Sequence, residues 1–231
     1  MQILENSILG LRAARLHYVN NQLSISVSLF PMVHFGEAEF FQTVYEDAFN
    51  HDVVLVEGVR SPVVKCLTAS YRWIDNASLG LVIQPKYPAA ETVNAKIIHA
   101  DLSMEEFNAE WRKVPLWLRA SVLLISPILG LKQRFFASRT SIFEGMSMED
   151  LESRDEILSW DPTHAALDHC ILGARDARIV EKLRAQIAQP DLKDRRIAVV
   201  YGALHMRAVL GELKRQNFVL MESRLQTVHA L

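Results

Sequence analysis

The chain has 231 residues, of which 50% are hydrophobic, and its 25 basic and 27 acidic side chains give a formal net charge of −2. This length fits one large domain, or one core domain that carries an insertion, and it is sufficient to bury a substantial core. The balanced charge and the lack of a basic stripe argue against a nucleic-acid partner. The cysteines, Cys66 and Cys170, are far apart, so neither a disulfide framework nor a zinc-thiolate site is indicated.

The N-terminal part of the chain predicts a hairpin followed by a helix and a strand. The first residues, MQILENSILG, lack a basic segment followed by an apolar run, so we expect a cytoplasmic protein. Residues 11–19 and 22–30 suit two strands, with a pair of asparagines at the turn. Apolar positions at helical spacing in residues 37–49 predict an amphipathic helix. The apolar run in residues 52–59 then predicts a strand buried on both faces.

Residues 61–190 show no comparable series of strand-like apolar segments. They predict a mainly helical insertion that packs on the sheet and covers a cleft. Within it, residues 114–131 are almost all apolar and nearly long enough to cross a bilayer, but Arg119 lies inside the run and prolines interrupt it. We expect a helix broken near Pro127 that forms a lid or an interface rather than a membrane span. Contact of this segment with a membrane surface stays open.

Two helices of the insertion have recognisable beginnings. Asp101 and Ser103 fit a helix start, with Glu106 completing a capping box, and we interpret this stretch as structural. Asp161 followed by Pro162 resembles an N-cap with proline in the first turn, which opens a long helix.

The C-terminal part repeats the order of the N-terminal part. Residues 196–201 predict a short buried strand, residues 206–213 an amphipathic helix, and residues 217–223 a further strand. Two tight strand–helix–strand units imply parallel neighbouring strands joined by crossovers.

These elements together predict a single α/β domain that spans residues 1–231. Its mainly parallel sheet is expected to come from about residues 1–60 and 191–223, with an N-terminal β-hairpin and a large helical insertion between them.

His34 and His205 fall just beyond predicted strands, and Glu57 falls at the carboxyl end of the apolar run VVLV. Ligands of open parallel sheets bind outside the carboxyl ends of the strands, and strands about 4.8 Å apart let such side chains reach a common point. Two histidines and a carboxylate suit a catalytic divalent metal with an open coordination position. A hydrogen-bonded packing residue is the commoner interpretation of any one such histidine, and the convergence of three groups favours a functional site.

His205 follows Gly202 at the point where a strand ends and a helix begins. The unpaired amides and the dipole of a helix start disfavour a positive charge, so we expect neutral imidazoles at His34 and His205. We further expect His205 to face the cleft and to contribute little to packing.

The motif GALH at residues 202–205, the strand-end Glu57 and the helical Arg175 followed by an aspartate resemble the TraB/PrgY/GumN family, which includes the TIKI metalloproteases. The erythromycin-esterase-like and ChaN-like proteins share the fold of that family. The first motif of this chain departs from the family pattern. It reads PMVH at residues 31–34, with proline in place of the usual glycine.

This resemblance implies a metal-dependent hydrolase that acts on a peptide or ester bond, with Mn or Co as the metal. His34, Glu57 and His205 would bind the metal, while Glu57 and His205 could also act as base or acid. Arg175 would bind a substrate carboxylate or stabilise an oxyanion. The alternative is a non-enzymatic binding or regulatory protein on the same scaffold, active in peptide-signal control or in haem or iron binding, and the proline at position 31 favours it.

Overall fold

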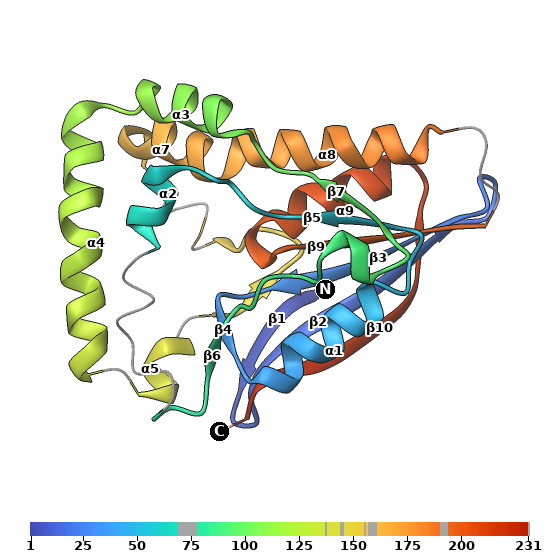
Figure 1. The fold of residues 1–231 in the computed structure, drawn as a ribbon, viewed down its shortest axis with the longest axis horizontal. Helices are drawn as coiled ribbons and strands as arrows, with labels where there is room; N and C mark the ends of the chain where they lie inside the picture. Colours follow the sequence, from blue (N-terminus) through green and yellow to red (C-terminus); the bar gives the residue numbers. More distant parts are fainter. Residues whose placement is uncertain are drawn as a thin grey trace.

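The computed structural model describes residues 1–68, 78–136, 138–143, 146–154, 156, 161–189 and 194–230. Its centre is an eight-stranded sheet in the order β7, β5, β9, β3, β2, β1 and β8, with β10 paired along β2 (Figure 1). These strands are β1 (Gln2–Ser7), β2 (Gly10–Asn20), β3 (Ile25–Met32), β5 (Val53–Val56), β7 (Lys96–His99), β8 (Met148–Glu149), β9 (Arg195–Gly202) and β10 (Val219–His229). The predicted α/β class is confirmed.

The strands β7, β5, β9 and β3 form the parallel part of the sheet. Met32 of β3 is level with Gly202 of β9, and Val56 of β5 is level with both Val200 and His99. The four carboxyl ends therefore meet along one edge. Every residue of β5 is buried, as the apolar run in the sequence predicts for a central parallel strand.

Helices cover both faces of this parallel part. The helix α1 (Ala38–Ala48) packs on one face, while α8 (Ala174–Ile187) and α9 (Met206–Arg215) lie together on the other (Figure 1). Between the layers is one continuous core that includes the fully buried side chains of Phe41, Leu55, Ile179 and Met206.

Both strand–helix–strand units differ from the expected arrangement of parallel neighbours. β3 and β5 are parallel, but β9 lies between them. β10 pairs antiparallel with β2, so the expected parallel pairing of the second unit is wrong. The reason is that β2 already pairs with β3 through the hairpin. The far edge of β2 is then the unpaired backbone that β10 can satisfy.

The insertion is mainly helical, as predicted, but it also adds to the eight-stranded sheet two strands that the sequence did not predict. β7 extends the sheet beyond β5, and β8 pairs with β1 at the other end. Both strands are short, and no residue of β7 is fully buried. Neither strand therefore has the long apolar run by which a buried strand is predicted from sequence. The expected boundary between insertion and core, at residues 190–193, lies outside the described residues.

The remaining described elements complete the insertion and the connections. They are β4 (Phe35–Gly36), β6 (Val82–Ile83), α2 (Pro62–Leu67), α3 (Met104–Lys113), α4 (Leu116–Phe136), α5 (Arg139–Phe143), α7 (Ala165–Asp168), a π-helical turn (His169–Gly173) and 3₁₀ turns at Ala90–Thr92, Pro162–His164 and Ala203–His205. The predicted capping box of Ser103 and Glu106 is present at the start of α3, and Asp161 caps the turn that leads toward α8.

The helix α4 runs without interruption past Pro127, so the expected break there is wrong. Proline removes one backbone hydrogen bond from a helix, and the contact of α4 with α2 helps to hold the rest together. No single helix in the described ranges is long and apolar enough to cross a membrane. The helices Met104–Lys113 and Leu116–Lys132 meet that test only as a pair, and they are bent by 114°.

Gly10 ends the tight turn between β1 and β2 with φ of 110°, and a Cβ there would lie 2.0 Å from the carbonyl oxygen of His229. We expect Gly10→Ala to lower the free energy of unfolding by about 3 kcal/mol, because both the backbone strain and the collision lie within a paired sheet. Denaturant unfolding measures this change. The control is Gly211→Ala in α9, where an added Cβ meets nothing within 4 Å. The control should gain about 0.5–1 kcal/mol, and equal stabilities would contradict the prediction.

Candidate active site

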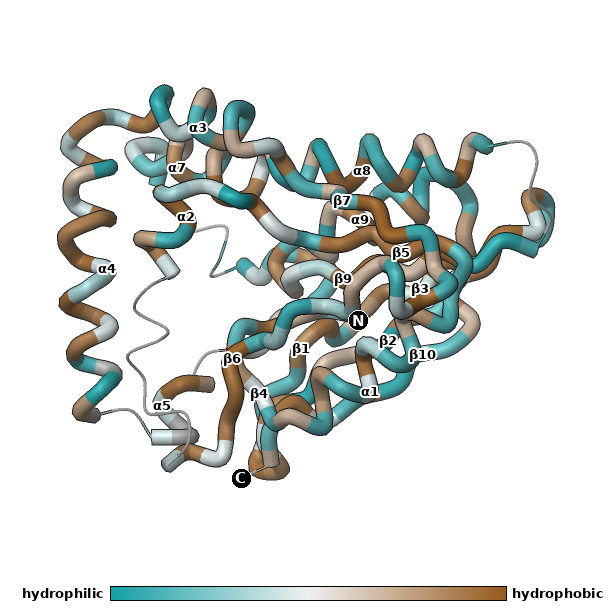
Figure 2. The backbone as a smooth tube through the Cα atoms, in the orientation of Figure 1, coloured by the Kyte–Doolittle hydropathy of each residue, from teal (hydrophilic) through white to brown (hydrophobic). Residues whose placement is uncertain are grey.

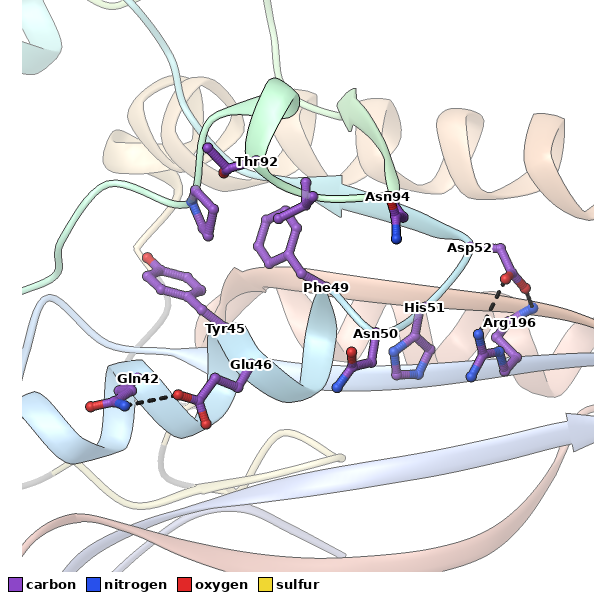
Figure 3. Close-up of a pocket in the computed structure, with 12 residues that line it drawn as sticks. Gln42, Tyr45, Glu46, Phe49, Asn50, His51, Asp52, Thr92, Asn94 and Arg196 are labelled. Atoms are coloured by element: carbon purple, nitrogen blue, oxygen red, sulfur yellow. Dashed lines mark hydrogen bonds and ion pairs between the residues drawn. The ribbon is translucent and has the colours of Figure 1, made fainter.

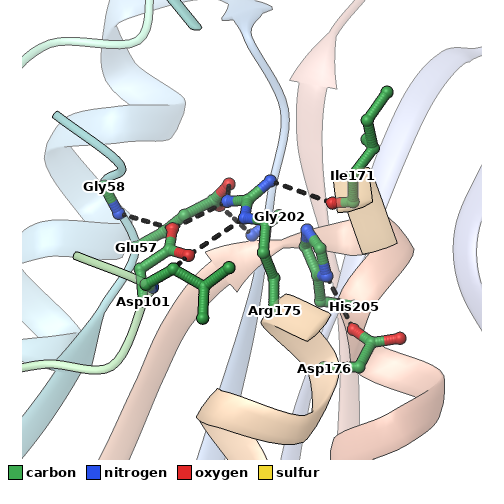
Figure 4. A network of polar contacts seen from close by, with 9 residues as sticks. Glu57, Gly58, Asp101, Ile171, Arg175, Asp176, Gly202 and His205 are labelled. Atoms are coloured by element: carbon green, nitrogen blue, oxygen red, sulfur yellow. Dashed lines mark hydrogen bonds and ion pairs between the residues drawn. The ribbon is translucent and has the colours of Figure 1, made fainter. Parts of the chain in front are cut away.

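Polar side chains follow the carboxyl ends of all four parallel strands. His34 follows β3, Glu57 follows β5, Asp101 follows β7, and His205 lies just after the last residue of β9. This edge is where open parallel sheets bind their ligands. Figure 4 shows that Glu57, Asp101 and His205 meet there with Arg175, which projects from α8.

Arg175 joins the ends of two strands through their carboxylates. Its Nε donates to Asp101 Oδ1 at 3.0 Å, and its Nη2 donates to Asp101 Oδ2 at 2.8 Å. The same Nη2 donates to Glu57 Oε1. The side chains are 14% exposed for Arg175, 20% for Glu57 and 2% for Asp101, so the three charges depend on one another for neutralisation.

Asp101 remains ionised although it is nearly buried. Burial raises the pKa of this carboxyl group, but the hydrogen bonds and the charge of Arg175 lower it further than burial raises it. The backbone amides of Gly58 and Leu102 also donate to the carboxylate, at 3.0 and 2.8 Å. The pKa of Asp101 is therefore below its ordinary value, and Asp101 acts here as a fixed negative charge.

Tyr201 lies beneath this ion cluster. Its ring centroid is 5.7 Å from the guanidinium carbon of Arg175, an arrangement typical of a cation–π contact. Burial, followed by the negative charge of Asp101, raises the pKa of the phenol. The hydroxyl is near Asp101, but among the described residues it has no partner in proper hydrogen-bond geometry. Tyr201 therefore remains a neutral phenol.

Glu57 and His205 share the space next to Gly202. The amide of Gly202 donates to Glu57 Oε2 at 2.5 Å. A Cβ at Gly202 would lie 3.0 Å from that oxygen and 3.4 Å from Cδ2 of His205. The Cδ2 edge of the imidazole therefore faces Gly202, as Oε2 of Glu57 does. A side chain at position 202 would displace both groups, which explains the glycine.

His205 is held by Asp176, whose Oδ1 lies 2.6 Å from Nδ1. A carboxylate at Nδ1 keeps the proton on that nitrogen and leaves Nε2 as the acceptor. The imidazole also packs edge-on against Tyr201, with ring centroids 4.9 Å apart. His205 is only 3% exposed and packs against Tyr201, so the expectation that it contributes little to packing is wrong. The side chains of α8 and Tyr201 enclose it.

His34 differs from His205 because it is exposed at the surface. The surrounding protein nevertheless removes enough water to lower its pKa, the charge of Glu57 opposes this shift, and the charge of Arg175 adds to it. The helix α1 begins only at Ala38, so desolvation is the main cause of the shift, rather than the expected helix start. A neutral and accessible imidazole can bind a metal or accept a proton.

The predicted ligands do not form a metal centre in this conformation. Within the part of the chain that the structure describes, no three His, Cys, Asp or Glu side chains stand close enough to hold a metal ion. Both carboxylate oxygens of Glu57 accept hydrogen bonds, and Nδ1 of His205 is bound to Asp176. His34, Glu57 and His205 would have to rearrange in order to share an ion.

A cavity of about 700 Å³ lies at the opposite edge of the sheet, beside the amino ends of the strands (Figure 3). Tyr45 and Phe49 contribute its aromatic side chains. Two of its charged residues pair with each other, since Asp52 accepts from the amide of Arg196 at 2.8 Å and from its guanidinium at 3.3 Å, and Glu46 accepts from the side-chain amide of Gln42 at 2.8 Å. The ring of His51 is likewise hydrogen bonded by the protein. The side chains that could act as acid, base or nucleophile therefore lie at the carboxyl edge rather than in this cavity.

No protein-family model, curated protein or solved structure matches the chain. The resemblance to the TraB/PrgY/GumN family therefore depends on the sequence motifs, and the function that it implies is a proposal.

Two acidic residues of the site, Asp101 and Asp176, are not among the site residues predicted from the sequence. The short run KIIH before Asp101 could have indicated this residue, because the run forms a further strand whose carboxyl end lies at the same edge. Asp176 directly follows Arg175 and is the aspartate of the family pattern. Its contact with His205 depends on how α8 packs, which the sequence does not reveal.

Replacement of Arg175 by methionine leaves Glu57 and Asp101 as unpaired carboxylates in a largely buried place. We expect Arg175→Met to lower the free energy of unfolding by about 3–5 kcal/mol at neutral pH. Because the pKa of Asp101 is lowered in the fold, its pairing stabilises the protein above the unfolded pKa and is lost as the pH falls through the folded pKa. The difference in the free energy of unfolding between the unaltered protein and the variant, measured with denaturant, should therefore become smaller as the pH is lowered toward about 3.

The matched control is Arg178→Met, one turn further along α8. Arg178 pairs with Glu106, whose side chain is 45% exposed, so its loss should cost no more than about 1 kcal/mol. Equal costs for the two variants at neutral pH would show that the Arg175 cluster does not stabilise the fold.

Proposed function

We propose that the protein is a hydrolase of the TraB/PrgY/GumN type, with its active site at the carboxyl edge of the sheet. The observation that supports this proposal is the meeting of Glu57, Arg175 and His205, which come from three separate elements, next to Gly202. Buried charges are costly unless a fold arranges partners for them. The pKa values of His34, Asp101 and Tyr201 at the same edge depart from their ordinary values, as is typical of active sites.

His205 and Asp176 would supply the acid–base chemistry. With its proton held on Nδ1 by Asp176, His205 can accept a proton from water at Nε2 and return it to a leaving group. Asp176 acts as a positioning residue, since it sets the tautomer and the orientation of the ring. His34, accessible and kept neutral, is the group on the open side of the edge that can contact the substrate.

Glu57 and Arg175 have more constrained roles than the sequence suggests. Arg175 is bound by the protein's own carboxylates, so we assign it the positioning of Glu57 rather than the binding of a substrate carboxylate. Glu57 places a fixed negative charge beside the imidazole of His205, where it would stabilise the protonated ring that forms during proton transfer.

The resemblance also implies Mn or Co, and the donor set as it stands does not fit such an ion. A metal would have to displace the hydrogen bonds that Glu57 makes to Arg175 and Gly202. We therefore derive no catalytic step through a metal, and we expect any binding of Mn or Co to be weak and to depend on His34.

A specific observation favours the second candidate, a non-enzymatic binding or regulatory protein. Both oxygens of Glu57 and most donors of Arg175 are already paired within the protein, as in an ion cluster that stabilises a scaffold. In that case the edge would bind a peptide or a haem group without turning it over.

Asp176→Asn tests the proposed hydrolase, because the amide keeps the shape of the carboxylate and removes its charge. We expect kcat/KM on a panel of p-nitrophenyl esters and fluorogenic peptides to fall by about 10²-fold or more, with a changed pH–rate profile. The acid limb of that profile reports the histidine, so a purely structural role for Asp176 would lower the amount of folded enzyme without moving the limb.

The control is Glu181→Gln on the same helix, whose side chain is 62% exposed and which should keep full activity. Assays with and without added Mn or Co, and with His34→Ala, measure the metal requirement. If no substrate turns over under any of these conditions while haem or a peptide binds and His34→Ala weakens that binding, the binding protein is the correct assignment.

A further inference from the structure

The outward face of α4 is a strip of exposed apolar side chains. Trp117, Leu124, Ile128, Leu131 and Phe135 recur at helical spacing, and each is between 51% and 69% exposed. Figure 2 shows how hydrophobic the helix is along its length, although it stands at the outside of the molecule. Single exposed apolar residues are common, whereas a continuous strip of this kind marks a surface of interaction.

The opposite face of α4 is already used to hold the helix on the protein. Leu118 is buried in a hydrophobic cluster with Phe107 and Trp111 of α3, and the hydroxyl of Ser126 donates to the carbonyl of Leu67 in α2 at 3.0 Å. The apolar strip therefore faces away from the core, and none of the residues that the structure describes covers it.

The charged residues of α4 itself are all basic. The helix contains Arg119, Lys132 and Arg134 and no acidic residue. The last turn of α3 adds Arg112 just before the strip begins, and also Lys113, whose charge is partly offset by its ion pair with Glu110 at 2.6 Å. Cations thus flank both ends of the strip.

We propose that α4 binds the surface of an anionic lipid bilayer. The apolar strip would enter the boundary between headgroups and acyl chains, with the flanking cations at the lipid phosphates. An apolar face combined with flanking basic residues is the pattern of helices that lie in the plane of a membrane. Trp117 and Phe135, near the two ends of the strip, are side chains that favour this interface.

A second copy of the chain is a poorer occupant of the strip. Two α4 helices packed against each other, in either direction, would bring basic residues together, and neither helix supplies an acidic side chain to pair with them. A helix that spans the bilayer also fits poorly, because α4 is fixed to α2 along one side and α3 is bent away from it by 114°.

Vesicle flotation of the full chain tests this proposal. The vesicles are phosphatidylcholine alone, or phosphatidylcholine with about 30% phosphatidylglycerol, whose negative surface potential attracts basic segments. We expect binding to the anionic vesicles, at least tenfold weaker binding to the neutral ones, and loss of binding at high salt. A blue shift of tryptophan fluorescence should accompany binding and be absent or much reduced in Trp117→Phe.

The variant Leu124→Asp with Ile128→Asp places two charges on the strip and should weaken vesicle binding at least tenfold. Both side chains are exposed, at 69% and 66%, so we expect the fold to tolerate the two substitutions, and circular dichroism tests this. Ile8→Asp is the control, because Ile8 is 91% exposed on the β1–β2 turn and should bind like the unaltered protein.

Three results would overturn the proposal. These are equal binding to neutral and anionic vesicles, equal binding by the doubly substituted strip variant, or no vesicle binding together with a dimer that the strip variant dissociates. The last result would assign the strip to a second copy of the chain.

Discussion

One buried cation, Arg175, sets the geometry of the carboxyl edge. Its guanidinium is the counter-charge for Glu57 after β5 and for Asp101 after β7, and all three side chains are mostly hidden from water. Backbone amides donate to both carboxylates, and Arg175 supplies the positive charge that offsets the cost of burying them. The insertion helix α8 is therefore tied to the sheet by charge as well as by apolar packing, and the position of Asp176 beside His205 follows from that attachment.

The apolar cluster behind the ions explains why Arg175 and Asp101 meet. Leu102, next to Asp101, and Cys170, in the π-helical turn before Arg175, belong to the same buried cluster. A π turn adds a residue to the helix and so changes the direction of the side chains that follow. Burial raises the pKa of the Cys170 thiol to about 11, so this cysteine packs as a neutral side chain and is not a nucleophile.

The sequence predicts those parts of the fold that local patterns determine. The apolar run of β5, the hairpin of β2 and β3 and the capping box of α3 follow from periodicity and turn chemistry. The pairing of β10 with β2 does not, because it depends on which sheet edge is left free. For the site, the sequence places Glu57 and His205 at one edge, but the enclosure of His205 depends on Tyr201 and α8. The residues next to a side chain in the sequence do not reveal which distant elements it will contact.

The insertion connects the carboxyl edge to the outward surface of α4. The helix α2 begins shortly after Glu57, and α4 packs on α2 with its inner face (Figure 1). The hydrophobic cluster that positions Asp101 also contains Leu118 of α4. A bilayer bound to the outer face of α4 would therefore lie on the side of the molecule toward which the parallel strands run. In that position the exposed His34 marks the part of the edge that a ligand can approach, because His205 is enclosed by α8 and Tyr201.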